Sequence, residues 1–108
     1  MNRLIDTAGL ERAIEDFARP RGWGQFHSPK NLAMALTGEV GELVELFQWL
    51  TEAQSADAMN DPEQARRIRE ELADVTIYLV RLASVLGVDL DAAVRDKLVK
   101  NALKYPAP

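Results

Sequence analysis

One long segment, residues 62–86, limits the possible folds of this chain more than any other. Asp61 followed by Pro62 is typical of a helix start, and Gly87 fits the left-handed position at which a helix ends. Apolar side chains lie nearly all round this helix: Leu72, Val75, Ile77, Leu79, Val80 and Leu82. A helix that is apolar on every side has to be buried on every side. In so small a chain this predicts a subunit interface, most simply in a symmetric dimer, and the alternative is a central helix inside a monomer.

Three other segments carry helical signals. Residues 8–19 place apolar side chains on one face and end at Pro20. Ser28 followed by Pro29 predicts a helix that continues to about residue 50, and Asp89 predicts the start of a helix that continues to about residue 104. Gln64 is expected to complete a capping box with Asp61, and residues 51–61 are expected to form a polar connection.

The chain shows no convincing strand alternation between turn signals. We therefore expect an all-α fold, a four-helix bundle-like domain assembled as an oligomer. The length of 108 residues predicts a single domain over residues 1–108.

Two short acidic motifs stand within the helical segments. Glu39 and Glu42 are separated by three positions, as are Glu71 and Asp74, so each pair projects from one helix face. The first acid of each pair also falls on an apolar stripe. The stripe around Glu39 comprises Leu32, Leu36, Leu43 and Leu46, and the stripe around Glu71 comprises Ile68, Val75, Tyr78 and Leu82. Both acids are therefore expected to face the core.

A carboxylate in a core is costly unless it is neutralised, paired or bound to a metal. Four carboxylates that converge cannot all stay ionised without a cation, and oxygen ligands suit Mg²⁺ or Mn²⁺. A magnesium cluster in turn indicates phosphate chemistry. The alternative is that the acids form ion pairs with arginines such as Arg67 or Arg81, or line a subunit contact. Two such pairs, each with its first acid on an apolar stripe, favour the metal.

Composition excludes several classes of function. A net charge of -4 argues against binding a nucleic-acid polymer, although a nucleotide with bound metal remains possible. The absence of cysteine excludes disulfides and thiolate metal sites. No apolar run approaches the ~20 residues of a membrane span, and no signal peptide is visible, so we expect no membrane contact and a cytoplasmic protein.

Three stretches of the chain carry a family resemblance: WGQFHSPKNLAMALTGEVGELVELFQW, EELADVTIYLVRLA and KLVKNALKYP. Together they resemble the MazG-like, all-α nucleotide pyrophosphohydrolases, and most closely the dCTP pyrophosphatase branch. Only residues 51–69 match weakly, and the ordered set of motifs is far more specific than one E-x-x-E. The resemblance implies hydrolysis of a nucleoside triphosphate, dCTP in that branch, to the monophosphate and pyrophosphate. It also favours a dimer of dimers.

The resemblance assigns roles to individual residues. It implies that Mg²⁺ is held by four carboxylates: Glu39, Glu42, Glu71 and Asp74. We expect Glu42 to be the catalytic residue that orients the attacking water. The residues expected to bind substrate are Trp23 and Trp49 at the base, His27, and Lys97, Asn101 and Tyr105 at the phosphates and sugar. For these the alternatives are core tryptophans, a structural histidine and a solvated helix end.

One position departs from the family pattern. In the dCTP branch a histidine of the first helix lies near the base, and Ile14 takes that position here. The departure predicts that dCTP is preferred and that 5-substituted dCTP is also accepted. Two competing hypotheses remain: a pyrophosphohydrolase for a broader or damaged set of deoxynucleotides, and a metal-free helical interaction module.

Overall fold

The computed structural model describes residues 3–108, and no strand occurs in that range. The α-helices are α1 (Ala8–Ala18), α2 (Pro29–Glu45), α3 (Glu52–Ala56), α4 (Pro62–Leu86) and α5 (Leu90–Lys104). Short 3₁₀ turns are η1 (Arg19–Arg21), η2 (Trp23–Phe26) and η3 (Ala58–Asn60). The prediction of an all-α fold is confirmed. Within the described range, none of the helices is both long and apolar enough to cross a membrane.

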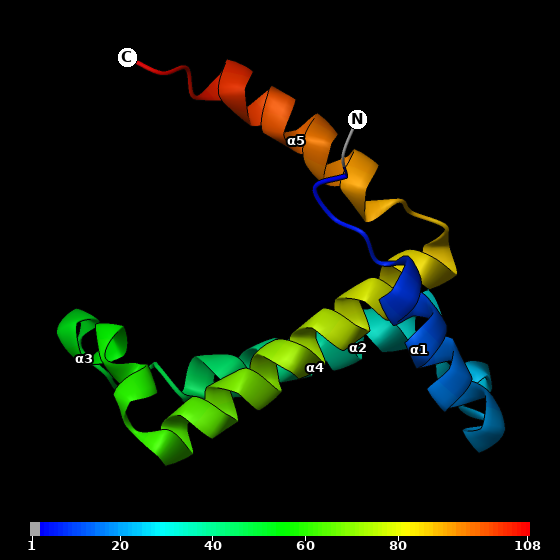
Figure 1. Ribbon diagram of the computed structural model, residues 1–108, viewed down its shortest axis with the longest axis horizontal. Coiled ribbons are helices and arrows are strands. Elements are labelled where there is room, and N and C mark those ends of the chain that lie inside the picture. The colour runs from blue at the N-terminus through cyan, green and yellow to red at the C-terminus, as the bar shows by residue number, and fades with distance from the viewer. Residues whose placement is uncertain (1–2) are drawn as a thin grey trace.

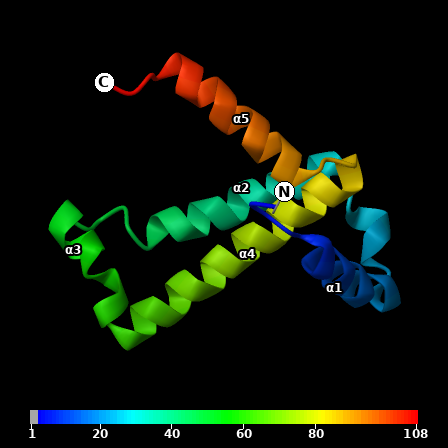
Figure 2. The ribbon, with the colours of Figure 1, turned by 45° about the horizontal axis from the view of Figure 1, so that its top comes forward.

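The packed part of the molecule is the pair α2 and α4, with α1 laid across α4 (Figure 1). The two long helices lie side by side in both views (Figures 1 and 2). Between them the core is small: Leu32 is the one large side chain of the described residues that is fully buried. Ile68 and Val80 of α4 join it at 5% and 3% exposure. This pair of helices positions the acidic motifs.

The predicted helix ends are mostly confirmed. Ser28 Oγ accepts a hydrogen bond from the Asn31 amide at 3.1 Å and starts α2. Asp89 accepts from the amides of Asp91 and Ala92 and starts α5. Gly87 has φ 70°, the left-handed conformation that glycine adopts without steric cost, and it ends α4.

The predicted end of α2 is wrong by about one turn. The helix ends at Glu45 rather than near residue 50. The amides of Leu46 and Phe47 bond three residues back, which tightens the last turn. Gln64 Nε2 then donates to the Leu46 carbonyl at 2.9 Å, so Gln64 holds the end of α2. The expected capping box of Asp61 and Gln64 is therefore also wrong, and Asp61 caps α4 alone, through the Glu63 amide.

The polar connection contains a helix that was not predicted. Thr51 and Gln54 form a capping box in which each side chain bonds the other residue's amide, and α3 follows. The motif was present in the sequence, but the segment has too little apolar periodicity to indicate a helix. Together with η3, α3 connects the C-terminal end of α2 to the start of α4.

The last helix departs from a closed bundle. Figures 1 and 2 show α5 extending away from the α2–α4 pair, and its only buried residue is Asp91. Leu98, Val99 and Leu103 are 53%, 62% and 79% exposed. The chain exposes 8071 Å², whereas a compact monomer of 12.0 kDa exposes about 6,000 Å². One copy of the chain therefore leaves apolar surface uncovered, as the sequence pattern of α4 also indicated.

Candidate functional site

Three carboxylates meet where α2 passes α4. Glu39 and Glu42 come from α2 and Glu71 comes from α4, and one oxygen from each lies within 4.8 Å of the others. Glu39 and Glu71 are half-buried, whereas Glu42 is exposed. We call these three residues the acidic cluster; it brings together three of the four predicted metal ligands.

Two oxygens of the acidic cluster are buried and have no hydrogen-bond partner in the described chain: Glu39 Oε2 and Glu71 Oε2. Arg67 and Arg81, the arginines that were considered as partners, instead pair with carboxylates elsewhere on α4 and on α1. The alternative in which these arginines balance the buried acids is therefore wrong. Since unpaired buried carboxylates are costly and oxygen ligands suit Mg²⁺ or Mn²⁺, the residues fit a divalent cation.

The environment of the acidic cluster changes its acidity. Burial raises the pKa of Glu39 from 4.5 to about 7, helped by the Glu71 carboxyl and by the charges of Glu42 and Asp74. Burial is also the main reason why the pKa of Glu71 is raised. Asp74 lies outside the group of three, but it is close enough for its charge to act on both buried acids. Without a cation, the cluster therefore retains a proton near neutral pH.

We expect the metal-free protein to lose stability as the pH rises from about 5 to about 8. Glu39 keeps its proton longer in the folded state than in the unfolded chain, so its contribution to stability is present at low pH and is lost as the pH passes through the folded pKa. The full shift from 4.5 to about 7 corresponds to about 3.4 kcal/mol, and half-burial reduces the expected effect to roughly 1–2 kcal/mol.

The measurement is the free energy of unfolding in the presence of a chelator, compared between the wild type and Glu39→Gln. The comparison is needed because burial lowers the pKa of His27, which changes stability in the opposite direction over the same pH range. The wild type should lose stability relative to Glu39→Gln as the pH rises. Parallel pH profiles for the two proteins would contradict the raised pKa of Glu39.

A cavity of about 400 Å³ lies between α1 and α4, and Asp74 connects it to the acidic cluster. Its walls are mainly apolar and include Ile14, Phe17 and Trp23. The few polar groups on its surface are His27, Asp74, Tyr78 and Arg81. A concave apolar site with few polar groups is typical of small-molecule binding. We call it the α1–α4 cavity.

Two predicted substrate-binding residues line the α1–α4 cavity. Trp23, in η2, packs edge-on against Phe17 with ring centroids 5.4 Å apart and an interplanar angle of 66°. His27 follows η2, and its Nδ1 accepts a hydrogen bond from Arg81. Because Nδ1 is the acceptor, neutral His27 carries its proton on Nε2.

Arg81 is a cavity residue that the sequence did not assign to the site. It is 8% exposed, and it joins Glu15 of α1 to His27. A signal was present, because Arg81 interrupts an apolar stretch of α4 in the same way that Glu39 interrupts α2. The partners of Arg81 are 54 and 66 positions away, so only the tertiary structure could identify them.

The remaining predicted site residues do not reach the acidic cluster or the cavity within one chain. Trp49 lies beyond the end of α2 and is 86% exposed, whereas Trp23 precedes the start of that helix. The whole of α2, 17 residues and roughly 25 Å of helix, lies between the two tryptophans along the chain. Lys97, Asn101 and Tyr105 lie on or next to α5, which extends away from the α2–α4 pair (Figure 1).

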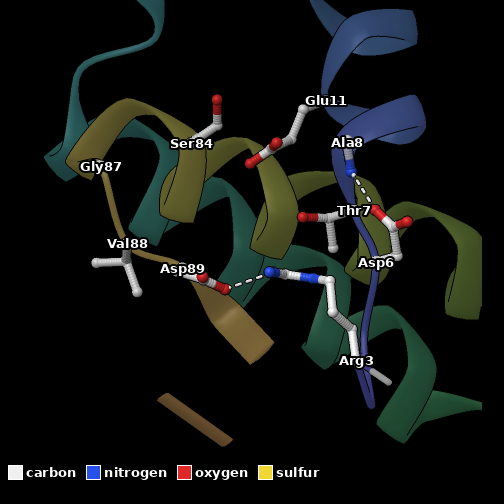
Figure 3. A pocket seen from close by; sticks show the side chains of 9 residues that line it. All are labelled: Arg3, Asp6, Thr7, Ala8, Glu11, Ser84, Gly87, Val88 and Asp89. Carbon is white, nitrogen blue, oxygen red and sulfur yellow. Dashed lines mark hydrogen bonds and ion pairs between the residues drawn. The ribbon is translucent and has the colours of Figure 1, made fainter. Parts of the chain in front are cut away.

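A second pocket, of about 480 Å³, lies at the far end of α4 (Figure 3). Arg3 Nη2 contacts Asp89 Oδ1 there at 2.6 Å, and Asp91 Oδ1 accepts hydrogen bonds from the amides of Leu4 and Ile5. These contacts fasten the N-terminal segment to the start of α5. Ser84, which lines this pocket, is roughly 20 Å along α4 from Glu71, so the pocket is separate from the acidic cluster.

Known proteins that resemble this chain are consistent with the geometry of the site. Residues 35–108 match the MazG-like family. The chain is 48% identical over 98 residues to dCTP pyrophosphatase 1 of Homo sapiens and 47% identical over 97 residues to that of Rattus norvegicus. These matches cover 91% and 90% of this chain but only 58% and 57% of the relatives, so the chain spans little more than half of their length.

A solved structure extends the likeness over the whole fold. The crystal structure of a pyrophosphatase from Archaeoglobus fulgidus superposes with a TM-score of 0.87 at 34% sequence identity. The match covers 99% of this chain and 98% of that one. All four predicted metal ligands lie within the matched family segment. The chain therefore belongs to the MazG-like family.

Proposed function

We propose that the protein hydrolyses a deoxynucleoside triphosphate, dCTP in preference to others, to the monophosphate and pyrophosphate with the help of Mg²⁺. The observation that carries the proposal is the pair of buried, unpartnered oxygens of Glu39 and Glu71 beside a largely apolar cavity. A cation site next to a base-sized cavity suits a nucleotide whose phosphates face the acids. The names of the relatives, dCTP pyrophosphatase 1 and a pyrophosphatase, support the same activity.

The acidic cluster and Asp74 would hold the cation. When bound, Mg²⁺ neutralises phosphate charge and favours in-line attack by water. Glu39 and Glu71 are suited to a fixed ligand role because both are half-buried between α2 and α4. Asp74 comes one turn after Glu71 and also lines the α1–α4 cavity, so it would lie between the phosphates and the nucleoside.

Glu42 is best suited to orient the attacking water. It is the exposed member of the acidic cluster, and water reaches it without crossing the helix pair. The water oxygen forms a bond to the α-phosphorus, and the bond from that phosphorus to the bridging oxygen breaks. Pyrophosphate leaves with the bridging oxygen, and the proton of the water passes through Glu42 to solvent.

Assembly of the chain into a homo-oligomer would complete the site. Trp49 and the phosphate-binding residues predicted on α5 are not part of the acidic cluster of their own chain. Exposed apolar residues such as Leu50 and Leu103 stand next to them in the sequence. A dimer, or a dimer of dimers, would bring them to the site of another copy while covering these apolar faces.

The wall of the cavity favours a tolerant pyrimidine site. Ile14 contributes an apolar surface where the family pattern has a histidine, and apolar walls reject an added methyl group only weakly, by about 1–3 kcal/mol. We therefore infer that 5-substituted dCTP is accepted alongside dCTP. Because Arg67 and Arg81 pair with other carboxylates, a metal-free interaction module is the weaker hypothesis.

The products test the proposed reaction. In water enriched in ¹⁸O, we expect dCTP to give pyrophosphate in one step, with the label in the phosphate of dCMP, because attack occurs at the α-phosphorus. Mass spectrometry of both products and phosphate assays during the time course measure this. Glu71→Gln serves as the inactive control. Release of dCDP as an intermediate, or label in pyrophosphate, would contradict the assignment.

A further inference from the structure

Arg81 is a buried charge that is held on two sides. Its Nε donates to His27 Nδ1 at 3.0 Å, and its Nη1 contacts Glu15 Oε2 at 2.5 Å. Arg81 belongs to α4, Glu15 belongs to α1, and His27 belongs to the segment before α2. Three elements therefore fix the position of a side chain that is only 8% exposed.

These contacts leave donors of the guanidinium unused. Within residues 3–108 no hydrogen-bond partner is found for Nη2, which carries two N–H groups. Nη2 is not among the buried side-chain atoms that lack a partner in the described residues, so an acceptor can still reach it. Arg81 also lines the α1–α4 cavity, whose other walls include the apolar Ile14, Trp23 and Ile77. A ligand in this cavity would supply the missing acceptor.

We propose that Arg81 determines the base specificity of the site by donating to the acceptor edge of cytosine, formed by O2 and N3. The inference rests on the proposed function, since it concerns the substrate of that same site. An arginine can only donate hydrogen bonds. Cytosine N3 accepts, whereas N3 of uracil and thymine carries a hydrogen and opposes a donor. Arg81 therefore favours dCTP over dUTP and dTTP.

Glu15 and His27 are positioning residues for Arg81. Hydrogen bonding and the charge of Arg81 lower the pKa of Glu15, so Glu15 stays a carboxylate opposite the guanidinium. Neutral His27 offers an acceptor to Nε and cannot compete for Nη2. The two contacts fix the orientation of the planar guanidinium and its donors. Lysine lacks such a planar arrangement of donors, so the two residues recognise acceptors differently.

The first experiment compares kcat/KM for dCTP and dUTP in four proteins: wild type, Arg81→Met, Arg81→Lys and the control Arg69→Met, which changes an exposed arginine of the same helix. We expect Arg81→Met and Arg81→Lys to lower the ratio of dCTP to dUTP by about 10- to 100-fold, because a charge-assisted hydrogen bond to one base is lost. Arg69→Met should keep the wild-type ratio. An equal loss for both nucleotides would overturn the proposal, because it would indicate contact with phosphate or a structural role.

A second measurement uses the wild-type protein and so does not depend on the folding of a variant. The probe is the triphosphate of 3-deaza-2′-deoxycytidine, in which a C–H group replaces N3. We expect wild-type kcat/KM to be about 10- to 100-fold lower for this probe than for dCTP, and Arg81→Lys to show little difference between the two. Equal use of probe and dCTP by the wild type would overturn the role of Arg81. Failure of the wild type to hydrolyse any deoxynucleotide would instead overturn the proposed function.

Discussion

Replacing any one of three half-buried acids should abolish turnover while the fold survives. We expect Glu39→Gln, Glu71→Gln and Asp74→Asn each to lower kcat/KM for dCTP by at least about 100-fold, since metal coordination supplies several kcal/mol of transition-state stabilisation. The amide keeps the shape of the side chain but is a poor ligand for Mg²⁺. Circular dichroism should report unchanged helix content, and steady-state kinetics with excess Mg²⁺ measures the loss.

The neighbouring residue on α4 provides a matched control. Glu70 stands one position before Glu71 but pairs with Arg66 at 2.9 Å on the exposed face of the helix. A surface ion pair contributes at most about 1 kcal/mol to stability, so Glu70→Gln should keep near wild-type activity. Calorimetry should detect Mg²⁺ binding by Glu70→Gln and not by Glu71→Gln. If two of the three variants Glu39→Gln, Glu71→Gln and Asp74→Asn keep near wild-type rates, the proposed metal site is wrong.

The acidic cluster was predictable because its signal is local. Glu39 and Glu71 interrupt apolar stripes, and the period of an α-helix alone decides that they face the same side as those stripes. Ser28 and Gly87 were likewise predictable, because helix caps depend on a few consecutive residues. That the two acids meet each other follows from the packing of α2 along α4, which the family resemblance implied.

Other features depended on contacts between distant residues. The network of Glu15, His27 and Arg81 joins three elements, and nothing in the sequence selects Glu15 from the other acids of α1 as the partner of Arg81. The early end of α2 depends on Gln64 reaching the Leu46 carbonyl from α4. The position of Trp49 depends on where α2 ends. If α2 continued to residue 50, the indole of Trp49 would project from the helix in a different direction.

Breaking the proposed oligomer should abolish activity as completely as removing one of the proposed metal ligands. The exposed area exceeds that of a compact monomer by about 2,000 Å², which is in the range that obligate interfaces bury. Leu79 of α4 is 43% exposed, and a charge at an apolar interface costs several kcal/mol. We expect Leu79→Glu to shift the mass in light scattering from a multiple of 12.0 kDa towards one chain, with loss of turnover. Arg12→Glu, which places the same carboxylate at an exposed position of α1, should leave the mass unchanged.

Mixing two inactive variants tests whether each site combines residues of two copies. We expect Glu71→Gln and Lys97→Met each to be inactive alone, because the first lacks a proposed metal ligand and the second lacks the phosphate contact proposed for α5. A mixed dimer contains one chain of each variant, and each of its two sites takes its carboxylates from one chain and Lys97 from the other. One site therefore carries both changes, and the other site carries neither. Refolding an equal mixture should therefore restore about a quarter of wild-type activity, since half of the dimers are mixed and half of their sites are intact. If α5 serves the acidic cluster of its own chain, every site in the mixture carries one change and no activity returns. That result would mean that α5 folds back over α2 and α4 rather than extending as in Figures 1 and 2.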